Sequence, residues 1–308
     1  MNLMNHEKHY NTLNNYYRHT YGTKVFKIPL NGSFTCPNID GRVGYGGCTF
    51  CSSEGSGEFA GFKGDPIKTQ YETVKKEMLK KWKEGKYIPY FQAFTNTYGP
   101  LEKLKTLFEE AITLDDDIIM ISIATRPDCL EKSTLDYLGE LNTKMPVQVE
   151  LGLQTIHQET SDLINRGHDL TSFNDAVTEL RKRNIEVVVH IINGLPGETK
   201  EMMVETAKYL STQDIQGIKI HMLHIMKKTK MGFDYVVKPW PLLSMEEYVD
   251  ITVTQLRHLR PDMIIHRVTG DAPKDMLIAP KWTLKKFVVS NEIDKLMRKL
   301  NVWQGDLV

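Results

Sequence analysis

The sequence has no excess of charge of either sign and no long apolar run. Its 308 residues contain 39 lysines and arginines against 39 aspartates and glutamates, so the formal net charge is zero. This balance excludes binding of nucleic acid through overall positive charge, although a local basic patch remains compatible with it. No run of 18 apolar residues is present to cross a membrane, and the polar start Met-Asn-Leu-Met-Asn lacks the apolar core of a secretory signal. We therefore expect a cytoplasmic protein without membrane contact.

Cysteine is scarce, and three of the four cysteines lie in one glycine-rich stretch. Eleven residues separate Cys36 from Cys48, and two separate Cys48 from Cys51. Thiolates bind soft metals such as zinc, or iron in a cluster, and the glycines between them let the backbone turn tightly around a bound group. We expect a metal centre here. Cys129 lies far along the chain, in Thr-Arg-Pro-Asp-Cys-Leu, and is expected to be a small buried residue.

Three ligands leave the kind of metal centre open. A structural zinc site takes four protein ligands, which His221 or His224 would have to complete. A four-iron cluster held by three cysteines leaves one iron free to bind another molecule. A disulfide with a spare thiol is disfavoured, because cytosolic thiols stay reduced. The residues alone thus allow an iron-sulfur enzyme or a zinc-binding protein with a structural or nucleic-acid-binding role.

Strand and helix patterns alternate along most of the chain. The expected strands are residues 24–30, 88–94, 117–124, 147–153, 185–193 and 217–223, and the helices between them are 65–85, 101–112, 131–142, 157–183 and 199–211. Such alternation predicts a parallel sheet with right-handed crossovers. Six units predict an α/β fold, a partial (β/α)6 TIM-like barrel over residues 24–238, with its chemistry at the carboxyl ends of the strands.

The two ends of the chain are expected to flank this barrel. Residues 1–23 predict a short helix or wrap before the first strand. Residues 239–308 predict a C-terminal α/β extension that closes the barrel. It would contain a helix at 244–259, a strand from Met263 and a final helix at 292–300.

The cysteine loop resembles the cluster loop of radical S-adenosylmethionine (SAM) enzymes, in which three cysteines ending in Cys-x-Phe-Cys follow the first strand. The commonest form of that motif has three residues in the first gap, whereas the long gap here is similar to the branch that includes the elongator catalytic subunit. Phe34-Thr-Cys-Pro-Asn and Gly-Gly-Cys-Thr-Phe-Cys most resemble the YtqA/YhcC (MnmL-type) family, over most of the chain. The resemblance implies a [4Fe-4S] cluster on Cys36, Cys48 and Cys51, with SAM bound at its open iron. It also implies a 5′-deoxyadenosyl radical that abstracts hydrogen from a substrate.

Polar residues at the expected strand ends are the positions that the resemblance assigns to SAM. Thr95 and Asn96 stand where relatives commonly have a Gly-Gly-Glu stretch that holds the methionine amino group. Glu150 is costly to bury without a partner, so an ion pair is the alternative to cofactor binding. Arg166 suits a planar carboxylate, and His190 is either a ribose contact or a core residue. The full set of cofactor contacts that the resemblance implies is Phe50, Thr95, Asn96, Glu150, Gln154, Arg166, His190, Gly194, Leu195 and Pro196.

The substrate is assigned by resemblance alone. The YtqA-like branch is associated with bacterial tRNA wobble-uridine modification, from 5-carboxymethylaminomethyl to 5-aminomethyl groups, which implies tRNA as a partner. It also implies an electron donor of the flavodoxin or ferredoxin type. A small metabolite or a protein side chain is the alternative substrate. The candidates for substrate contact are Lys219, His221, Arg267 and Asp271, and those for a basic rim are Lys227, Lys228, Lys230 and Arg267.

Overall fold

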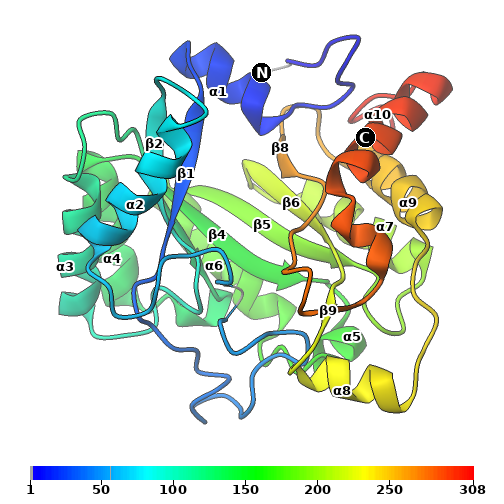
Figure 1. Cartoon of the computed structure of the whole chain (residues 1–308), viewed down its shortest axis with the longest axis horizontal. Helices are drawn as coiled ribbons and strands as arrows, with labels where there is room; N and C mark the ends of the chain where they lie inside the picture. Colours follow the sequence, from blue (N-terminus) through cyan, green and yellow to red (C-terminus); the bar gives the residue numbers. More distant parts are fainter. Residues whose placement is uncertain (1–2, 56) are drawn as a thin grey trace.

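A seven-stranded, all-parallel sheet forms the centre of the computed structural model, which describes residues 3–55 and 57–308 (Figure 1). The strand order is β1-β2-β3-β4-β5-β6-β8, which leaves β1 and β8 as the edges of the curled sheet. The strands are β1 (Val25–Leu30), β2 (Lys86–Phe91), β3 (Ile121–Thr125), β4 (Val147–Gln154), β5 (Glu186–Asn193), β6 (Gly217–Met222) and β8 (Ile264–Arg267). A second, antiparallel pair joins β7 (Ile225–Met226) to β9 (Leu277–Ala279).

Helices surround this sheet, because each parallel crossover must return outside it. In Figure 1, α2, α3 and α4 lie on one side, α7 and α9 lie on the other, and α1 and α8 lie at opposite ends. The α-helices are α1 (Leu13–Tyr21), α2 (Ile67–Leu79), α3 (Leu101–Ile112), α4 (Lys132–Lys144), α5 (Gln158–Leu163), α6 (Leu170–Lys182), α7 (Lys200–Ser211), α8 (Lys230–Val237), α9 (Met245–His258) and α10 (Lys286–Leu300). Two 3-10 turns, η1 (Pro127–Cys129) and η2 (Lys281–Leu284), complete the set. In the described part of the chain, every helix is too short or too polar to span a membrane.

The central strands have an apolar outward face and a partly polar inward face. Val187, Val189 and Ile191 of β5 are buried in the main hydrophobic core, whereas His190 between them lines an internal cavity. Strands covered on both sides are usually apolar throughout. The polar residues on the inner face therefore mark the inside of the barrel as the place to look for chemistry.

The predicted α/β barrel is confirmed, with one strand more than expected. Strand β8 comes from the C-terminal segment and pairs in parallel with β6, so the sheet has seven strands rather than six. The single helix predicted for residues 157–183 is wrong. It is divided into α5 and α6, because Asn165 and Gly167 adopt positive φ angles of 52° and 77°, which a right-handed helix does not allow. The last helix begins at Lys286, six residues earlier than expected.

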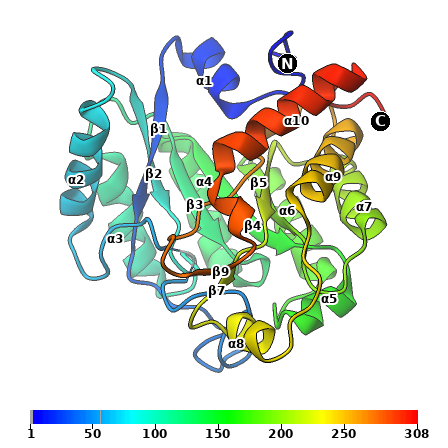
Figure 2. The same ribbon diagram turned by 45° about the vertical axis from the view of Figure 1, so that its right-hand side comes forward.

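Both ends of the chain close the open side of the curled sheet. The segment before α1 joins β8, since the amide of Ile265 donates to the carbonyl of Asn11 at 2.8 Å. Helix α1 packs against β1 and β8, the two edge strands. Figure 2 shows the segment from β9 into α10 passing in front of the sheet. The barrel interior is thus enclosed by elements from both termini.

Candidate active site

A cavity of about 870 Å³ fills the barrel interior and opens beside the cysteine loop. Pockets for small ligands and cofactors commonly have volumes of about 300–1,000 Å³. Cys36, Cys48 and Cys51 all line the cavity. Cys129 is buried and is not among the lining residues, as expected for a packing role. The three predicted ligands therefore share one end of a single cavity.

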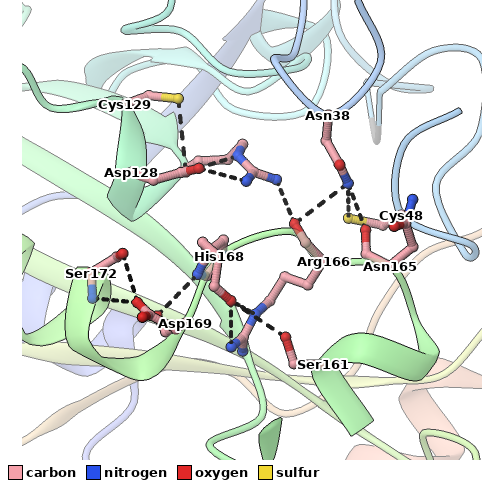
Figure 3. Close-up of polar contacts among 11 residues, drawn as sticks. Asn38, Cys48, Asp128, Cys129, Ser161, Asn165, Arg166, His168, Asp169 and Ser172 are labelled. Carbon is pink, nitrogen blue, oxygen red and sulfur yellow. Dashed lines mark hydrogen bonds and ion pairs between the residues drawn. The ribbon is translucent and has the colours of Figure 1, made fainter. Parts of the chain in front are cut away.

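Two asparagines hold the cysteine loop against the turn that follows α5 (Figure 3). The Asn38 side-chain amide donates to the carbonyls of Asn165 and Arg166, at 2.5 and 3.4 Å, and lies 3.9 Å from the Cys48 sulfur. In return, the Asn165 side chain donates to the carbonyl of Gly47 at 2.8 Å. These reciprocal bonds hold the part of the loop that precedes Cys48 against the turn after α5. The positive φ of Asn165 is tolerated because asparagine adopts this conformation more readily than most residues.

Positive charge lies close to the sulfur atoms. Burial raises the pKa of the Cys48 thiol to about 11, and the nearby Arg126 guanidinium opposes that rise. Arg126 is itself fixed by Asp128, through two hydrogen bonds of 2.9 and 2.7 Å. A thiol must lose its proton to bind metal, so a neighbouring cation favours metal binding. Three thiols beside a fixed guanidinium form a donor set that fits an iron-sulfur cluster.

Arg166, a predicted SAM contact, lies against the backbone at the end of β4. Its guanidinium donates to the carbonyls of Leu153, Thr155 and His168, and only 1% of the residue is exposed. Burial lowers its pKa to about 10. The side chain thus braces the end of β4 against the α5–α6 turn. Its predicted contact with a carboxylate of SAM stays a prediction.

Glu150 is the centre of a buried polar network inside the barrel. One carboxylate oxygen pairs with Lys27 and accepts from Ser122 Oγ at 3.0 Å. The other pairs with Lys219 and accepts from Tyr90 Oη at 2.8 Å. Six strands of the sheet meet at this carboxylate, because His190 of β5 also contacts it, with Nε2 at 2.6 Å from Oε2. Glu150 therefore forms two ion pairs, one with Lys27 and one with Lys219, as the alternative to cofactor binding predicted.

The environment of this network shifts the pKa values of its members. Burial alone would raise the pKa of Glu150, but Lys219, Lys27 and His190 hold it well below its usual range. Burial lowers the pKa of Lys219 to about 7, a shift that the neighbouring Glu150 opposes and Lys27 reinforces. Burial and Lys219 lower the pKa of His190 to about 4, so its ring is neutral at pH 7. Glu150 is therefore ionised at neutral pH, while the pKa of Lys219 lies near 7.

Gln154 reaches the cavity through an irregularity in β4. The pairing of β4 with β5 shifts register between Gly152 and Gln154, and Gln154 has a φ of 62°. Such bulges re-aim side chains, often next to active sites. The side chain folds over Gly152, where a Cβ atom would lie 2.7 Å from the Gln154 Nε2 atom. A larger residue at 152 would displace this side chain, and Gln154 lines the cavity as predicted.

The remaining predicted cofactor contacts divide between the cavity and the packing around it. Thr95 lines the cavity, whereas the Asn96 amide donates to the Ala124 carbonyl at 2.9 Å and its oxygen is buried without a partner in the described structure. Phe50 lines the cavity and packs on a small apolar cluster that includes Leu195. Gly194, Leu195 and Pro196 are not among the residues that line it.

The four candidate substrate residues all line the same cavity. Lys219 and His221 alternate along β6 and point inward, while Ile220 between them is buried in the core. Arg267 donates to Asp271 at 3.0 Å. His224 also lines the cavity, and the Nε2 atoms of His221 and His224 are buried without a partner among the described residues. In the ranges 3–55 and 57–308, no three His, Cys, Asp or Glu side chains converge on one metal ion position.

Family models match most of the chain. The Radical SAM superfamily model matches residues 40–210, and the Radical SAM C-terminal domain model matches residues 215–299. The chain belongs to the radical SAM superfamily. It is thus an enzyme, and membership implies a [4Fe-4S] cluster and SAM as its cofactors. The C-terminal model begins just before β6, and it includes β8, the strand that the segment 239–308 contributes to the barrel wall.

Two of the relatives cover nearly the whole chain. YtqA of Bacillus subtilis is 50% identical over 301 residues, which cover 98% of this chain and 93% of that protein. YhcC of Escherichia coli is 32% identical over 287 residues, covering 92% and 90%. A protein named tRNA uridine(34) acetyltransferase, from Methanocaldococcus jannaschii, is 30% identical over 170 residues, covering 54% of this chain and 31% of that protein. The predicted YtqA/YhcC relationship is confirmed.

A solved structure supports the radical SAM fold. The archaeal Elp3 of Methanocaldococcus infernus, with its N-terminus deleted, superposes with a TM-score of 0.67 at 17% identity, covering 91% of this chain and 64% of that one. A curled parallel sheet of this kind is therefore shared with the elongator subunit.

Several partners of Glu150 were not recognised in the sequence. Lys27, Tyr90 and Ser122 lie on β1, β2 and β3, and only the curling of the sheet brings them to β4. The one signal in the sequence was a lysine, Lys27, in the otherwise apolar strand Val25–Leu30, which indicates a side chain that needs a buried partner. In this radical SAM barrel the inner face is therefore more highly charged than the sequence pattern indicated.

Proposed function

We propose that this chain uses a [4Fe-4S] cluster on Cys36, Cys48 and Cys51 to cleave SAM. We further propose that it acts on the wobble uridine of tRNA, from 5-carboxymethylaminomethyl-uridine to 5-aminomethyl-uridine. The observation that carries the proposal is the position of three cysteine thiols at one end of an internal cavity of about 870 Å³. When bound, cluster and SAM would supply a 5′-deoxyadenosyl radical to that cavity. The residues of the chain then have to aim one C–H bond of the substrate at it and exclude water.

The two ends of the cavity differ in chemistry, and we therefore assign them different roles. At the cysteine end, Asn38 and Asn165 fix the loop and Arg126 supplies positive charge. Further inside, the Glu150 network offers ion pairs and hydroxyl groups that can orient a polar substrate. We assign the first group to the cofactors and the second to the substrate.

Two features support tRNA as the substrate. One relative is named for uridine 34 of tRNA, although this chain spans less than a third of it. Exposed lysines also lie at the cysteine end, where Lys227 and Lys228 precede α8 and the amide of Met231 in α8 donates to the carbonyl of Thr49 at 2.8 Å. Lysines placed there can contact phosphate and position an RNA over the opening. We propose a flavodoxin- or ferredoxin-type donor for the electron.

Nucleoside mass spectrometry of tRNA from cells with and without this gene tests the proposal. Deletion should cause 5-carboxymethylaminomethyl-uridine to accumulate, and the wild-type gene should restore the profile whereas a Cys51→Ala gene should not. An unchanged profile would remove tRNA as the target and favour a small metabolite or a protein side chain. In that case, purified protein that still forms 5′-deoxyadenosine from SAM would keep the radical SAM assignment.

A further inference from the structure

The inner part of the cavity carries more cations than carboxylates. Away from the cysteine end, its charged lining residues are Lys27, Lys219, Arg267 and Lys286 against Glu150 and Asp271. Four positive groups facing two negative ones leave an excess of two positive charges when all are ionised. A third lining carboxylate, Glu58, accepts from Ser52 beside the cysteine loop at 2.5 Å. A cavity lined by such an excess attracts an anion.

The two lysines bound to Glu150 differ in their remaining capacity to donate. Lys27 uses all three ammonium protons, on Glu150, Gln148 Oε1 at 2.8 Å and Ser122 Oγ at 3.1 Å. Lys219 donates to Glu150 and to Tyr90 Oη at 3.3 Å, which leaves one proton without an acceptor among the described residues. That proton is available to a ligand in the cavity.

Arg267 lies next to Lys219 on the neighbouring strand. The register of β6 and β8 places the two residues opposite each other, and both line the cavity. Arg267 donates to Asp271 through Nη2, and a guanidinium has further donors in the same plane. A carboxylate has two oxygens, and two adjacent cationic donors can bind it through charge-assisted hydrogen bonds.

The rings beside these cations add hydrogen-bonding atoms without adding charge. The centroids of His190 and His221 lie 5.2 Å apart, and burial lowers the pKa of both residues. The buried Nε2 atom of His221 has no partner within the described residues. A polar ligand in this part of the cavity would satisfy it, since buried polar atoms are normally hydrogen-bonded.

We infer that Lys219 and Arg267 bind a carboxylate of the substrate, with Glu150 as the positioning residue that holds Lys219 in place. The identity of that carboxylate rests on the proposed function, in which the 5-carboxymethylaminomethyl group carries one and the 5-aminomethyl product does not. The site therefore discriminates substrate from product and favours product release. Lys219 lies within β6 rather than at its end, deeper than the loop that carries the cysteines.

Calorimetric titration of the cluster-loaded, full-length protein with two small probes tests this inference. N-ethylglycine reproduces the secondary amine and the carboxylate of the substrate side chain. N-ethylglycinamide keeps the amine but has an uncharged amide in place of the carboxylate. We expect wild-type protein to bind N-ethylglycine about tenfold more tightly than the amide. Lys219→Met should abolish the difference and Lys219→Arg should retain most of it. Lys295→Met, an exposed control on α10, should leave it unchanged. Lys219→Met should still fold, because Glu150 keeps its pair with Lys27, and thermal unfolding checks this.

Each other outcome overturns the inference. Equal affinity for the two probes, no binding of either, or a difference that survives in Lys219→Met would show that Lys219 does not bind a carboxylate. Loss of N-ethylglycine binding on saturation with SAM would assign the site to the methionine carboxylate of SAM instead. The tRNA profile is a separate readout. N-ethylglycine binding with an unchanged tRNA profile would support the carboxylate site and exclude tRNA as the substrate. A changed tRNA profile without probe binding would support tRNA as the substrate and exclude the carboxylate site.

Discussion

Glu150 is the carboxylate that Lys27 and Lys219 share, so its replacement by glutamine leaves two buried ammonium groups without a counter-ion. Removing one partner of a buried ion pair typically costs about 3–5 kcal/mol of the free energy of unfolding. Lys27 keeps its acceptors Ser122 and Gln148, which limits its share of the loss. Lys219 keeps only Tyr90. We expect Glu150→Gln to lower the free energy of unfolding by about 3–5 kcal/mol, mostly through Lys219.

This loss should depend on pH, because Lys219 can lose its proton. Its folded pKa of about 7 lies below the unfolded value of about 10.4, and without Glu150 it falls further. Between the folded and unfolded pKa values the unfolded chain binds more protons, so stability rises with pH. That rise starts at lower pH in the variant than in the wild type. The loss of unfolding free energy caused by Glu150→Gln is therefore largest in mild acid. As the pH rises to about 7, this loss shrinks by up to about 1.4 kcal/mol per pH unit.

Urea denaturation followed by circular dichroism measures both quantities, at about pH 5.5 and about pH 8. Glu102→Gln is the matched control, because Glu102 pairs with Lys105 on the exposed surface of α3 and should lose less than about 1 kcal/mol. A loss below about 1 kcal/mol for Glu150→Gln at both pH values, or a loss that grows with pH, would refute the counter-ion role.

Three further changes test other parts of the site. Alanine at Cys36, Cys48 or Cys51 should remove bound iron and sulfide and abolish 5′-deoxyadenosine formation. Cys129→Ala, outside the cavity lining, should keep the bound iron and sulfide and the activity. Iron retained in a loop variant would contradict the assignment. Gly167→Ala places a Cβ 2.8 Å from Asn38 Oδ1 at a φ of 77° and should lower both the melting temperature and the iron content. Gly64→Ala, with a φ of 94° and open space around it, should show backbone strain alone, so equal effects would argue against the Asn38 contact. Arg166→Met leaves buried carbonyl groups unpaired and should cost about 2–4 kcal/mol in urea denaturation, with less than 1 kcal/mol showing that the brace is unimportant.

The rigidity of the cysteine loop has a clear origin in the fold. The turn between α5 and α6 provides the carbonyls that Asn38 needs, and Arg166 holds that same turn against β4. Loop, turn and strand therefore form one connected unit (Figure 3). A cluster bound to the loop would keep a fixed position relative to the cavity, which is what aiming a radical at one C–H bond requires.

The local pattern of the sequence was enough for much of the fold. Alternating apolar strands and amphipathic helices have only one common arrangement, a parallel sheet with helices outside, so β1 to β6 were predictable. Local pattern failed where a single backbone conformation decides. Residues 157–183 continue a helical pattern through Asn165 and Gly167, whose positive φ angles end α5. The strand at Ile264 was expected, but its place beside β6 was not, because strand order is a property of tertiary contacts.

The sequence alone predicted a metal centre at the cysteine end, since thiolates bind soft metals, and the resemblance to radical SAM enzymes favoured an iron-sulfur cluster over zinc. The inner end was decided only by the tertiary structure. Lys27, Glu150 and Lys219 are separated by more than 60 residues at each step, and no local pattern relates them. They meet because a parallel sheet that curls directs alternate side chains of every strand toward one axis. Burial at that axis lowers the pKa of Lys219, whereas the two lysines brought there hold the pKa of Glu150 well below its usual range.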